Sequence, residues 1–170
     1  MQNNIKNARK EKDLILGIDP GYERLGLALI ENKNENPQLV YSECFQTNSE
    51  LSHFERLRLI ISRIKQILDE FEPSRIALET LIFSKNVKTA LKIAEVRGII
   101  LGEGAYRNIF IQEFHPNEIK IAITGFGKAD KKQIIFMVEK ILKLNKKLKY
   151  DDEYDAIAIA LTAGTRKLST

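Results

Sequence analysis

Apolar residues along the chain follow two different spacing patterns. The first, a short continuous apolar run, predicts β-strands. Residues 14–18 form an unbroken apolar run, typical of a strand buried on both faces, and the run stops at the turn sequence Asp19-Pro20-Gly21. Other short apolar runs bounded by polar residues also have the length of strands. The predicted strands are 14–18, 25–30, 39–45, 75–79 and 109–114, with a hairpin connection over 31–37.

The second pattern, in which apolar residues recur every three or four positions, predicts helices. It is clear over 49–71, where Glu72-Pro73 then ends the pattern. Apolar residues nearly surround the predicted helix 86–107, so we expect the core to cover one side and a second subunit to cover the other. The predicted helices are 49–71, 86–107, a short one from Pro116, 130–144 and 152–165, with a Gly-rich loop over 124–127.

This order of elements predicts an α/β fold. Three strands in succession indicate an antiparallel meander, and the later alternation of strands with helices adds strands that require crossover connections. The expected architecture is a five-stranded mixed sheet flanked by helices on both faces. The length of 170 residues fits one domain, which we place at 13–170, and the polar segment 1–12 is expected to be a disordered leader.

Composition narrows the class of protein without naming a function. Hydrophobic residues make up 44% and charged residues 29% of the chain, which supports a globular core. A net charge of +4 permits a polyanionic partner but does not require one. The single cysteine, Cys44, excludes an internal disulfide and fits a reducing cytosol, and we interpret it as a small residue in or beside a strand. Neither a membrane-spanning run nor a secretory signal is recognisable, so a cytoplasmic location is expected.

Four carboxylates lie where strands or helices end. Asp19 follows the first strand and Glu79 ends the fourth, so both would emerge at one edge of the sheet if these strands are neighbours. Asp152 and Asp155 share one face at the start of the last helix. Turn chemistry could account for Asp19, solvation at a strand end for Glu79, and helix capping for Asp152. Asp155 lies among apolar residues and needs a cation or a hydrogen-bond donor.

If the four acids converge, their chemistry points to a metal. Carboxylates within a few ångströms of one another repel and raise one another's pKa values, and a divalent cation removes that conflict. Oxygen ligands without His or Cys select Mg²⁺, or Mn²⁺ in its place, and two such ions could hold a phosphodiester, activate water and stabilise the departing 3′-oxygen. The sequence therefore predicts a metal-dependent phosphodiesterase with catalytic and metal-binding residues Asp19, Glu79, Asp152 and Asp155.

Five blocks of sequence resemble, in order, the Holliday junction resolvases of the RuvC family, the crossover junction endodeoxyribonucleases. The blocks are 15–21 (ILGIDPG), 79–98 (beginning ETLIFSKN), 116–120 (PNEIK), 125–133 (GFGKADKKQ) and 152–160 (DEYDAIAIA). Each block is weak alone, but the ordered set covers 14–165. The resemblance implies a ribonuclease-H-like fold and a cytoplasmic homodimer that nicks four-way DNA junctions symmetrically in recombination and repair. It further implies catalysis by the same four acids, helix 86–107 as the dimer interface, and the RuvA–RuvB branch-migration complex as a partner.

Lysines flank the loops expected around the acids. Scattered lysines are usually solvated, but beside a carboxylate site they would offset the repulsion between the acids and DNA. The resemblance implies that Lys120 and Lys131 contact phosphate, and the amides of 125–127 could face another phosphate or form a plain loop. The predicted DNA-binding residues are Ile82, Phe83, Lys85, Asn86, Lys88, Lys120, Lys128, Lys131 and Lys132.

The chain departs from the family pattern at three places. Ile82 stands where the family often has an aromatic residue that interacts with bases, and Phe83 follows it. Leu25 replaces the usual Thr, and Glu153 and Tyr154 replace small residues in the last block. These changes bear on sequence preference and junction opening more than on metal binding.

Three other functions compete with that of a junction enzyme. A RuvC-like nuclease could act on RNA or other branched DNA, and a non-cleaving module could bind junctions and recruit partners. The complete third block favours the junction enzyme over the first, and the presence of all four acids counts against the second. An ATPase of the actin and sugar-kinase superfamily is set aside because the chain is too short for two lobes.

Overall fold

A computed structural model describes residues 13–33, 36–81 and 87–166. The prediction of a disordered leader over 1–12 lies outside these residues. No helix among the residues described is both long enough and apolar enough to cross a membrane.

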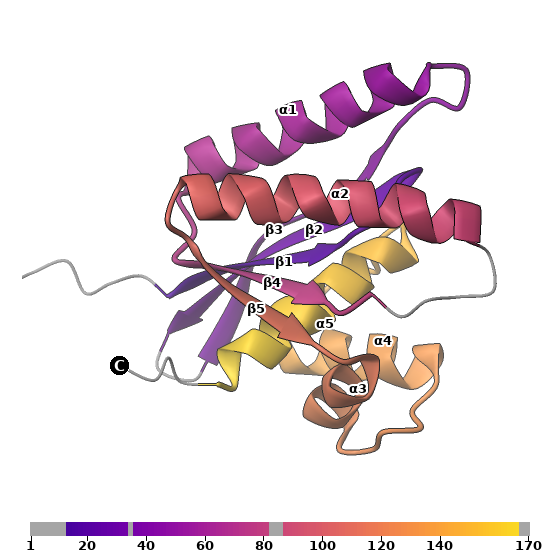
Figure 1. Ribbon diagram of the computed structural model, residues 1–170. Coiled ribbons are helices and arrows are strands. Elements are labelled where there is room, and N and C mark those ends of the chain that lie inside the picture. Colours follow the sequence, from indigo (N-terminus) through magenta and orange to yellow (C-terminus); the bar gives the residue numbers. More distant parts are fainter. Residues whose placement is uncertain (1–12, 34–35, 82–86, 167–170) are drawn as a thin grey trace, which may run out of the picture.

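The five predicted strands form one mixed sheet in the order β3-β2-β1-β4-β5 (Figure 1). β1 pairs antiparallel with β2, and β2 pairs antiparallel with β3, as the predicted meander requires. β4 pairs parallel with both β1 and β5. The strands are β1 (Leu14–Asp19), β2 (Arg24–Lys33), β3 (Asn36–Gln46), β4 (Arg75–Glu79) and β5 (Phe110–Phe114).

The predicted hairpin between β2 and β3 is confirmed, but its connection is shorter than 31–37 because most of these polar residues belong to the two strands. Glu31 pairs with Gln38 and Asn32 with Pro37 at the far end of the β2–β3 ladder. Backbone hydrogen bonds do not require apolar side chains, and a proline is tolerated on an edge strand such as β3. A polar hairpin end therefore looks like a loop in the sequence.

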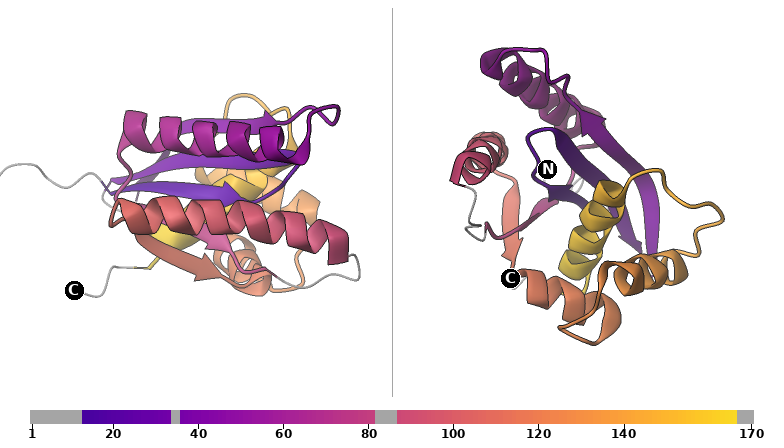
Figure 2. Two further views of the ribbon diagram at one scale, coloured as in Figure 1. Left: turned by 45° about the horizontal axis from the view of Figure 1, so that its top comes forward. Right: turned by 90° about the vertical axis from the view of Figure 1, so that its right-hand side faces the viewer.

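Five helices cover the two faces of the sheet, as predicted. α1 and α2 lie on one face, and α5 lies on the other with α3 and α4 beside it (Figures 1 and 2). The helix over 49–71 begins later than predicted because Ser52 caps it through a capping box with Glu55. The helices are α1 (His53–Phe71), α2 (Val87–Tyr106), α3 (Pro116–Thr124), α4 (Lys131–Ile141) and α5 (Asp151–Gly164).

β1 lies between two hydrophobic cores, which explains its unbroken apolar sequence. Leu16 and Ile18 belong to the core under α1 and α2, whereas Ile15 belongs to the core around α5. All three side chains are fully buried. Because successive residues of a strand point to opposite faces, a strand with both faces covered must be apolar at nearly every position.

Two glycines allow α5 to lie directly on the backbone of the sheet. A Cβ atom on Gly17 would lie 2.2 Å from the carbonyl oxygen of Ala156, and one on Gly26 would lie 2.1 Å from that of Asp152. Both distances are far below van der Waals contact, so only glycine fits at these positions. Since Gly26 pairs with Asp19, this contact brings the start of α5 to the end of β1.

We expect Gly17→Ala to lower the free energy of unfolding by about 1–3 kcal/mol or more, because the added methyl group meets helix backbone that cannot turn aside. Urea unfolding followed by circular dichroism measures the loss. Gly127→Ala is the control, since its Cβ atom would meet only the Ile121 side chain, at 3.4 Å or more. If Gly17→Ala and the unchanged chain are equally stable, α5 does not lie in direct contact with the backbone of β1 at Gly17.

Candidate active site

Two of the predicted acids end neighbouring strands. β1 and β4 run parallel and pair Ile18 with Leu78, so Asp19 and Glu79 emerge together at the same edge of the sheet. This confirms the predicted placement of these two carboxylates. The arrangement follows from the apolar sequences of both strands, which bury everything up to the terminal acid.

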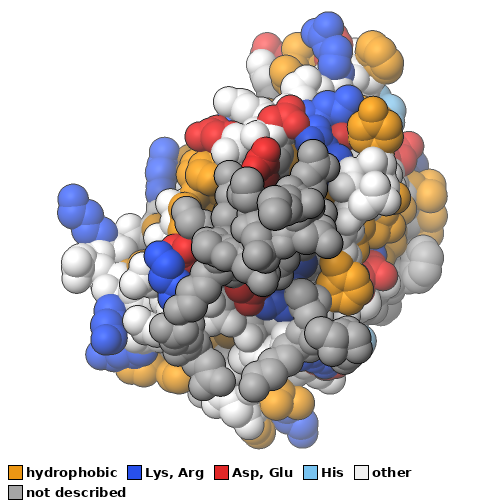
Figure 3. All heavy atoms as spheres, turned by 90° about the vertical axis from the view of Figure 1, so that its left-hand side faces the viewer, with side chains coloured by type: hydrophobic (Ala, Val, Ile, Leu, Met, Phe, Trp, Pro, Cys, Tyr) orange, Lys and Arg blue, Asp and Glu red, His pale blue; other side chains and the backbone are white. Residues whose placement is uncertain are grey.

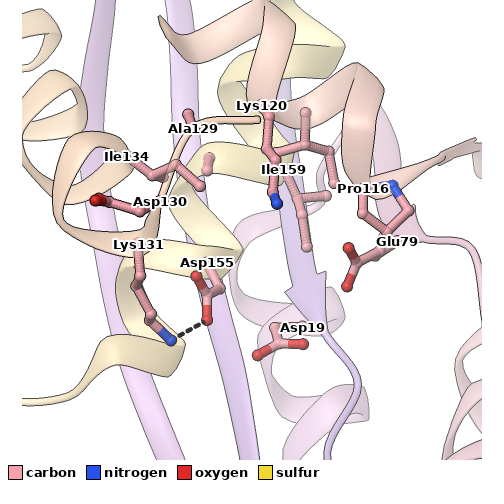
Figure 4. Close-up of a pocket in the computed structure, with 12 residues that line it drawn as sticks. Asp19, Glu79, Pro116, Lys120, Ala129, Asp130, Lys131, Ile134, Asp155 and Ile159 are labelled. Atoms are coloured by element: carbon pink, nitrogen blue, oxygen red, sulfur yellow. Dashed lines mark hydrogen bonds and ion pairs between the residues drawn. The ribbon is translucent and has the colours of Figure 1, made fainter. Parts of the chain in front are cut away.

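α5 brings a third carboxylate to the same place. Asp155 lines a pocket of about 310 Å³ together with Asp19 and Glu79, and Lys120 and Lys131 border it from α3 and α4 (Figure 4). The three acids come from β1, β4 and α5, which are distant in sequence. The pocket therefore exists only because the sheet and the last helix are packed as described above.

The electrostatics of the pocket show how closely the acids approach. Burial, followed by the negative charges of Asp155, Glu79 and Asp152, raises the pKa of Asp19 to about 7. Burial, followed by the charge of Asp155, also raises the pKa of Glu79. The pKa of Asp155 is raised as well, mainly by burial. Such mutual repulsion is the condition under which a divalent cation binds well.

Asp155 has the cationic partner that its position requires. The Lys131 ammonium lies 2.8 Å from the Asp155 carboxylate and 3.6 Å from that of Asp151 (Figure 4). Lys131 is the first residue of α4, so the close packing of α4 against α5 fixes this contact. The prediction that Asp155 needs a cation or a donor is confirmed.

Asp152 faces away from the pocket toward β2 and β3. Its carboxylate lies 3.0 Å from the Arg24 guanidinium and 3.7 Å from the Cys44 sulfur. Cys44 lies in β3, as expected, but its contact with Asp152 was not predicted. The ion pair between Arg24 and Asp152 was also not predicted, because the two residues are far apart in the sequence and no local pattern indicates their contact.

The donor set fits a hard divalent cation. The ligands offered to the pocket are carboxylate oxygens, and neither His nor Cys lines it, which is the chemistry of Mg²⁺ or Mn²⁺ sites. In the part of the chain that the structure describes, no group of three or more His, Cys, Asp or Glu side chains is arranged to hold a metal ion. Lys131 and Arg24 instead bind two of the four carboxylates, so an incoming cation would replace these ion pairs.

Arg97 supports Glu79 from the opposite side. Its guanidinium is largely buried and donates to the backbone carbonyl of Glu79 and to the carboxylate of Glu113. Arg97 also borders a second hollow, of about 200 Å³, on the far side of Asp19 and Glu79. Arg97 lies within the second family-like block, 79–98, but its contact with Glu79 was not predicted.

Of the other predicted DNA-binding residues that the structure describes, it places only Lys120 in the pocket. Lys88 and Lys128 are exposed, and Lys132 borders a separate groove beside Phe126. Ile82, Phe83, Lys85 and Asn86 lie outside the described residues.

The candidate phosphate site formed by the amides of 125–127 is wrong for two of its three members. The N–H of Gly125 donates to the carbonyl of Ile121 at 2.8 Å, and that of Phe126 donates to Thr124 Oγ1 at 3.1 Å. Gly125 ends α3 in a left-handed conformation, so these amides complete the helix terminus. They are not available to a phosphate.

The two unusual residues of the last block have partners inside the protein. The Ser42 hydroxyl donates to the Glu153 carboxylate at 2.8 Å. The Tyr154 hydroxyl donates to Glu139 at 2.8 Å and accepts the Leu148 N–H at 3.0 Å. Glu153 and Tyr154 therefore fasten α5 to β3 and to the end of α4.

Comparison with known proteins gives a consistent result over nearly the whole chain. A family model described as "Crossover junction endodeoxyribonuclease RuvC" matches residues 15–163. A protein of that name from Thermosipho melanesiensis is 40% identical over 146 residues, which cover 86% of this chain and 93% of the relative. The protein of that name from Brachyspira hyodysenteriae is 40% identical over 153 residues, covering 90% and 94%.

Solved structures agree with the sequence comparisons. The T. thermophilus RuvC in complex with Holliday junction substrate superposes with a TM-score of 0.83 at 30% identity and covers 88% of this chain and 91% of its own. The yeast mitochondrial Holliday junction resolvase Ydc2 has a TM-score of 0.65 at 14% identity, covers 88% and 77%, and supports the fold alone. The ribonuclease-H-like architecture expected from the sequence is confirmed.

Proposed function

Because this chain belongs to the RuvC family of crossover junction endodeoxyribonucleases, we propose that it resolves four-way DNA junctions by symmetric, metal-dependent hydrolysis of phosphodiester bonds. The observation that carries the proposal is the pocket in which Asp19, Glu79 and Asp155 meet, with lysines at its rim. Carboxylates that lie close together and have raised pKa values are suited to binding a divalent cation, which relieves their mutual repulsion. Resolution of junctions in recombination and repair follows from that chemistry and from the family.

The metal-binding residues in this proposal are Asp19, Glu79, Asp152 and Asp155. They would hold Mg²⁺, with Mn²⁺ able to replace it, and we propose two ions in each site. When bound, the metal supplies positive charge that activates water and stabilises the departing 3′-oxygen. Asp152 reaches the site by leaving Arg24, with which it is paired in the structure.

The lysines of the pocket have a separate task, which is to receive phosphate. A site lined by carboxylates repels DNA, and Lys120 and Lys131 place two positive charges inside it. Lys131 neutralises Asp155 in the absence of DNA, and a phosphate oxygen can take the place of that carboxylate as its partner. Lys85, Lys88, Lys128 and Lys132 extend the proposed contacts along the strand, and Ile82 and Phe83 belong to the proposal as apolar contacts at the crossover.

We propose a homodimer formed through the outward face of α2. Ala90, Val96 and Ile100 are buried against the core, as predicted for one side of this helix. On the other side Val87 and Leu91 are 66% and 59% exposed. Gly98 and Gly102 continue this face, and a Cβ atom on either would meet no atom within 4 Å. Apolar and small residues on one exposed face allow a second helix to approach closely, and a two-fold dimer matches a junction of similar symmetry.

Leu91→Glu is expected to weaken the dimer by at least about 100-fold, because it buries an unpaired carboxylate in an apolar contact. Sedimentation velocity over a range of concentrations measures the change. Phe54→Glu, which alters a residue of α1 that is 74% exposed, is the control and should leave the assembly unchanged. If Leu91→Glu sediments like the unchanged chain, α2 is not the interface.

The proposal is tested with a synthetic four-way junction. In Mg²⁺ the purified protein should nick two strands of like polarity and release ligatable duplexes, and EDTA should stop the reaction. Equal cleavage of linear duplex, or cleavage that EDTA does not affect, would reject the resolvase. Cleavage of RNA alone would favour the RNA nuclease, and tight junction binding without any cutting would favour the non-cleaving module.

Two further parts of the proposal rest on family membership. These are cooperation with the RuvA–RuvB branch-migration complex and a cytoplasmic location, where junctions between chromosomal DNA molecules arise. Cooperation with the RuvA–RuvB complex predicts that a junction is resolved faster when this complex is bound to it.

A further inference from the structure

The connection between α4 and α5 carries an unusual concentration of charge. Residues 140–149 contain five lysines and no acidic residue. The whole chain has 27 Lys and Arg against 23 Asp and Glu, so without these five lysines the counts would be 22 and 23 and the net charge −1. The segment alone thus carries a charge of +5, which exceeds the net charge of +4 of the whole chain. The lysine segment consists of Lys140, Lys143, Lys146, Lys147 and Lys149 with the residues between them.

The lysine segment has a fixed shape that turns its charges outward. Leu142, Leu144 and Leu148 are partly buried against the core around α5, and all five lysines are exposed. The Tyr154 hydroxyl joins Glu139 to the Leu148 N–H and so ties the start of the segment to its end. Lys143 adopts a left-handed conformation that ends α4 earlier than the sequence predicted. A segment held in this way presents its charges without a large ordering cost.

These charges are not neutralised within the described part of the chain. No carboxylate there forms an ion pair with any of the five, and Lys140 and Lys149 instead lie over the rings of Phe136 and Tyr150, at 5.4 Å and 4.9 Å. On the face drawn in Figure 3, Lys and Arg side chains appear in separate groups among acidic and apolar ones. The lysine segment is thus a distinct patch of one sign.

Its position relative to the pocket is set by α4. That helix begins at Lys131 in the pocket and has 11 residues, so its far end lies about 16 Å away at 1.5 Å per residue. The lysine segment begins there and returns to Tyr150, which precedes the first turn of α5. In the right panel of Figure 2, which faces the end of the sheet where β1 and β4 finish, this connection projects at the side of the molecule.

We propose that the lysine segment is a second DNA-contact surface, which binds the backbone phosphates of one duplex arm outside the cleavage site. Duplex DNA rises 3.4 Å per base pair, so the start of the segment, about 16 Å from Lys131, corresponds to about five pairs from the cleaved bond. The end of the segment returns to α5 beside the pocket. Rows of exposed lysines match a regular row of phosphates, and their attraction offsets the repulsion between DNA and the acidic pocket. The inference rests on the proposed function and names the part of the substrate that this chain holds beyond its active site.

The test uses the triple variant Lys143→Gln, Lys146→Gln, Lys147→Gln. Every protein also carries Asp19→Asn so that the junction stays intact in Mg²⁺, and fluorescence anisotropy gives the junction Kd at several salt concentrations. Loss of three phosphate contacts should weaken binding at least about tenfold and reduce the slope of log K against log salt by about 2.7. Replacing the same lysines by arginine should restore both values, and removing Lys33, Lys65 and Arg58 instead should change neither.

A chemically altered junction locates the contact. Neutral methylphosphonate linkages four to seven pairs from the crossover should weaken binding by the unchanged lysine segment but should not weaken the triple variant further. The same linkages 12 to 15 pairs away should affect both proteins equally. An unaltered salt slope in the triple variant, or equal sensitivity of both proteins to the near linkages, would overturn the inference. If the chain with an intact lysine segment shows no preference for junctions, the proposed function fails instead, so the two failures are distinguishable.

Discussion

Asp19→Asn is expected to reduce junction nicking by at least about 10³-fold while junction binding persists. Asp19 receives the charges of all three other acids, and its loss removes the central oxygen ligand of the proposed metal site. Metal charge contributes several kcal/mol to such reactions, and each 1.36 kcal/mol is a factor of ten in rate. The measurement is the single-turnover nicking rate in Mg²⁺, together with the junction Kd.

A matched control for this variant lies on the same pocket. Asp130 also lines it, but its carboxylate caps α4 by accepting the Gln133 N–H at 2.9 Å and points away from the other acids (Figure 4). Asparagine caps helices about as well as aspartate, so Asp130→Asn should cut normally. If the two variants lose the same activity, or if Asp19→Asn still cuts, Asp19 is not a catalytic residue.

The stability of the metal-free protein should fall as the pH rises from about 4 to about 7. Asp19 ionises near pH 3.8 in the unfolded chain but near 7 in the folded one, so between these values the folded state holds the extra proton. Stability is therefore greatest below the lower pKa and is lost as the pH passes the higher one. The shift corresponds to about 4 kcal/mol at most.

Urea unfolding in EDTA between pH 4.5 and 8.5 measures this loss. Asp19→Asn cannot ionise there, so its stability should change less over this range and exceed that of the unchanged chain by up to about 4 kcal/mol at pH 8. Added Mg²⁺ should restore stability only to the chain that keeps Asp19. If the free energy of unfolding depends on pH in the same way in both proteins, the pKa of Asp19 is not raised in the folded protein. The variant expected to be most stable without metal is thus the one expected to be inactive.

Local sequence was enough to place Asp19 and Glu79, but it predicted neither that Asp152 lies outside the pocket nor which residues pair with the acids. Asp19 and Glu79 could be predicted because a buried strand must end where its apolar run ends. The need of Asp155 for a cation could be predicted from burial, but Lys131 could be named only through the family resemblance. Arg24 was missed because its contact with Asp152 depends on where α5 crosses the sheet, which no local pattern records.

The errors in the fold have a common physical origin, which is that backbone hydrogen bonds do not depend on side-chain polarity. Asn32 and Pro37 read as a loop because they are polar or ring-constrained, yet their backbones extend the hairpin. The amides of Gly125 and Phe126 were predicted either to face a phosphate or to belong to a plain loop, yet they form hydrogen bonds that complete the end of α3. Local sequence therefore predicts well which side chains are buried, but it predicts poorly which groups the backbone amides bind.

The seating of α5 on Gly17 and Gly26 has a consequence for how the enzyme tolerates change. The spacing between Asp19 and the acids of α5 is set by main chain resting on main chain, with no side chain between them. Substitutions among the surrounding isoleucines and leucines should therefore change the free energy of unfolding without changing the positions of the carboxylates. Such a core can drift in composition over long times while the chemistry at its edge keeps the same dimensions.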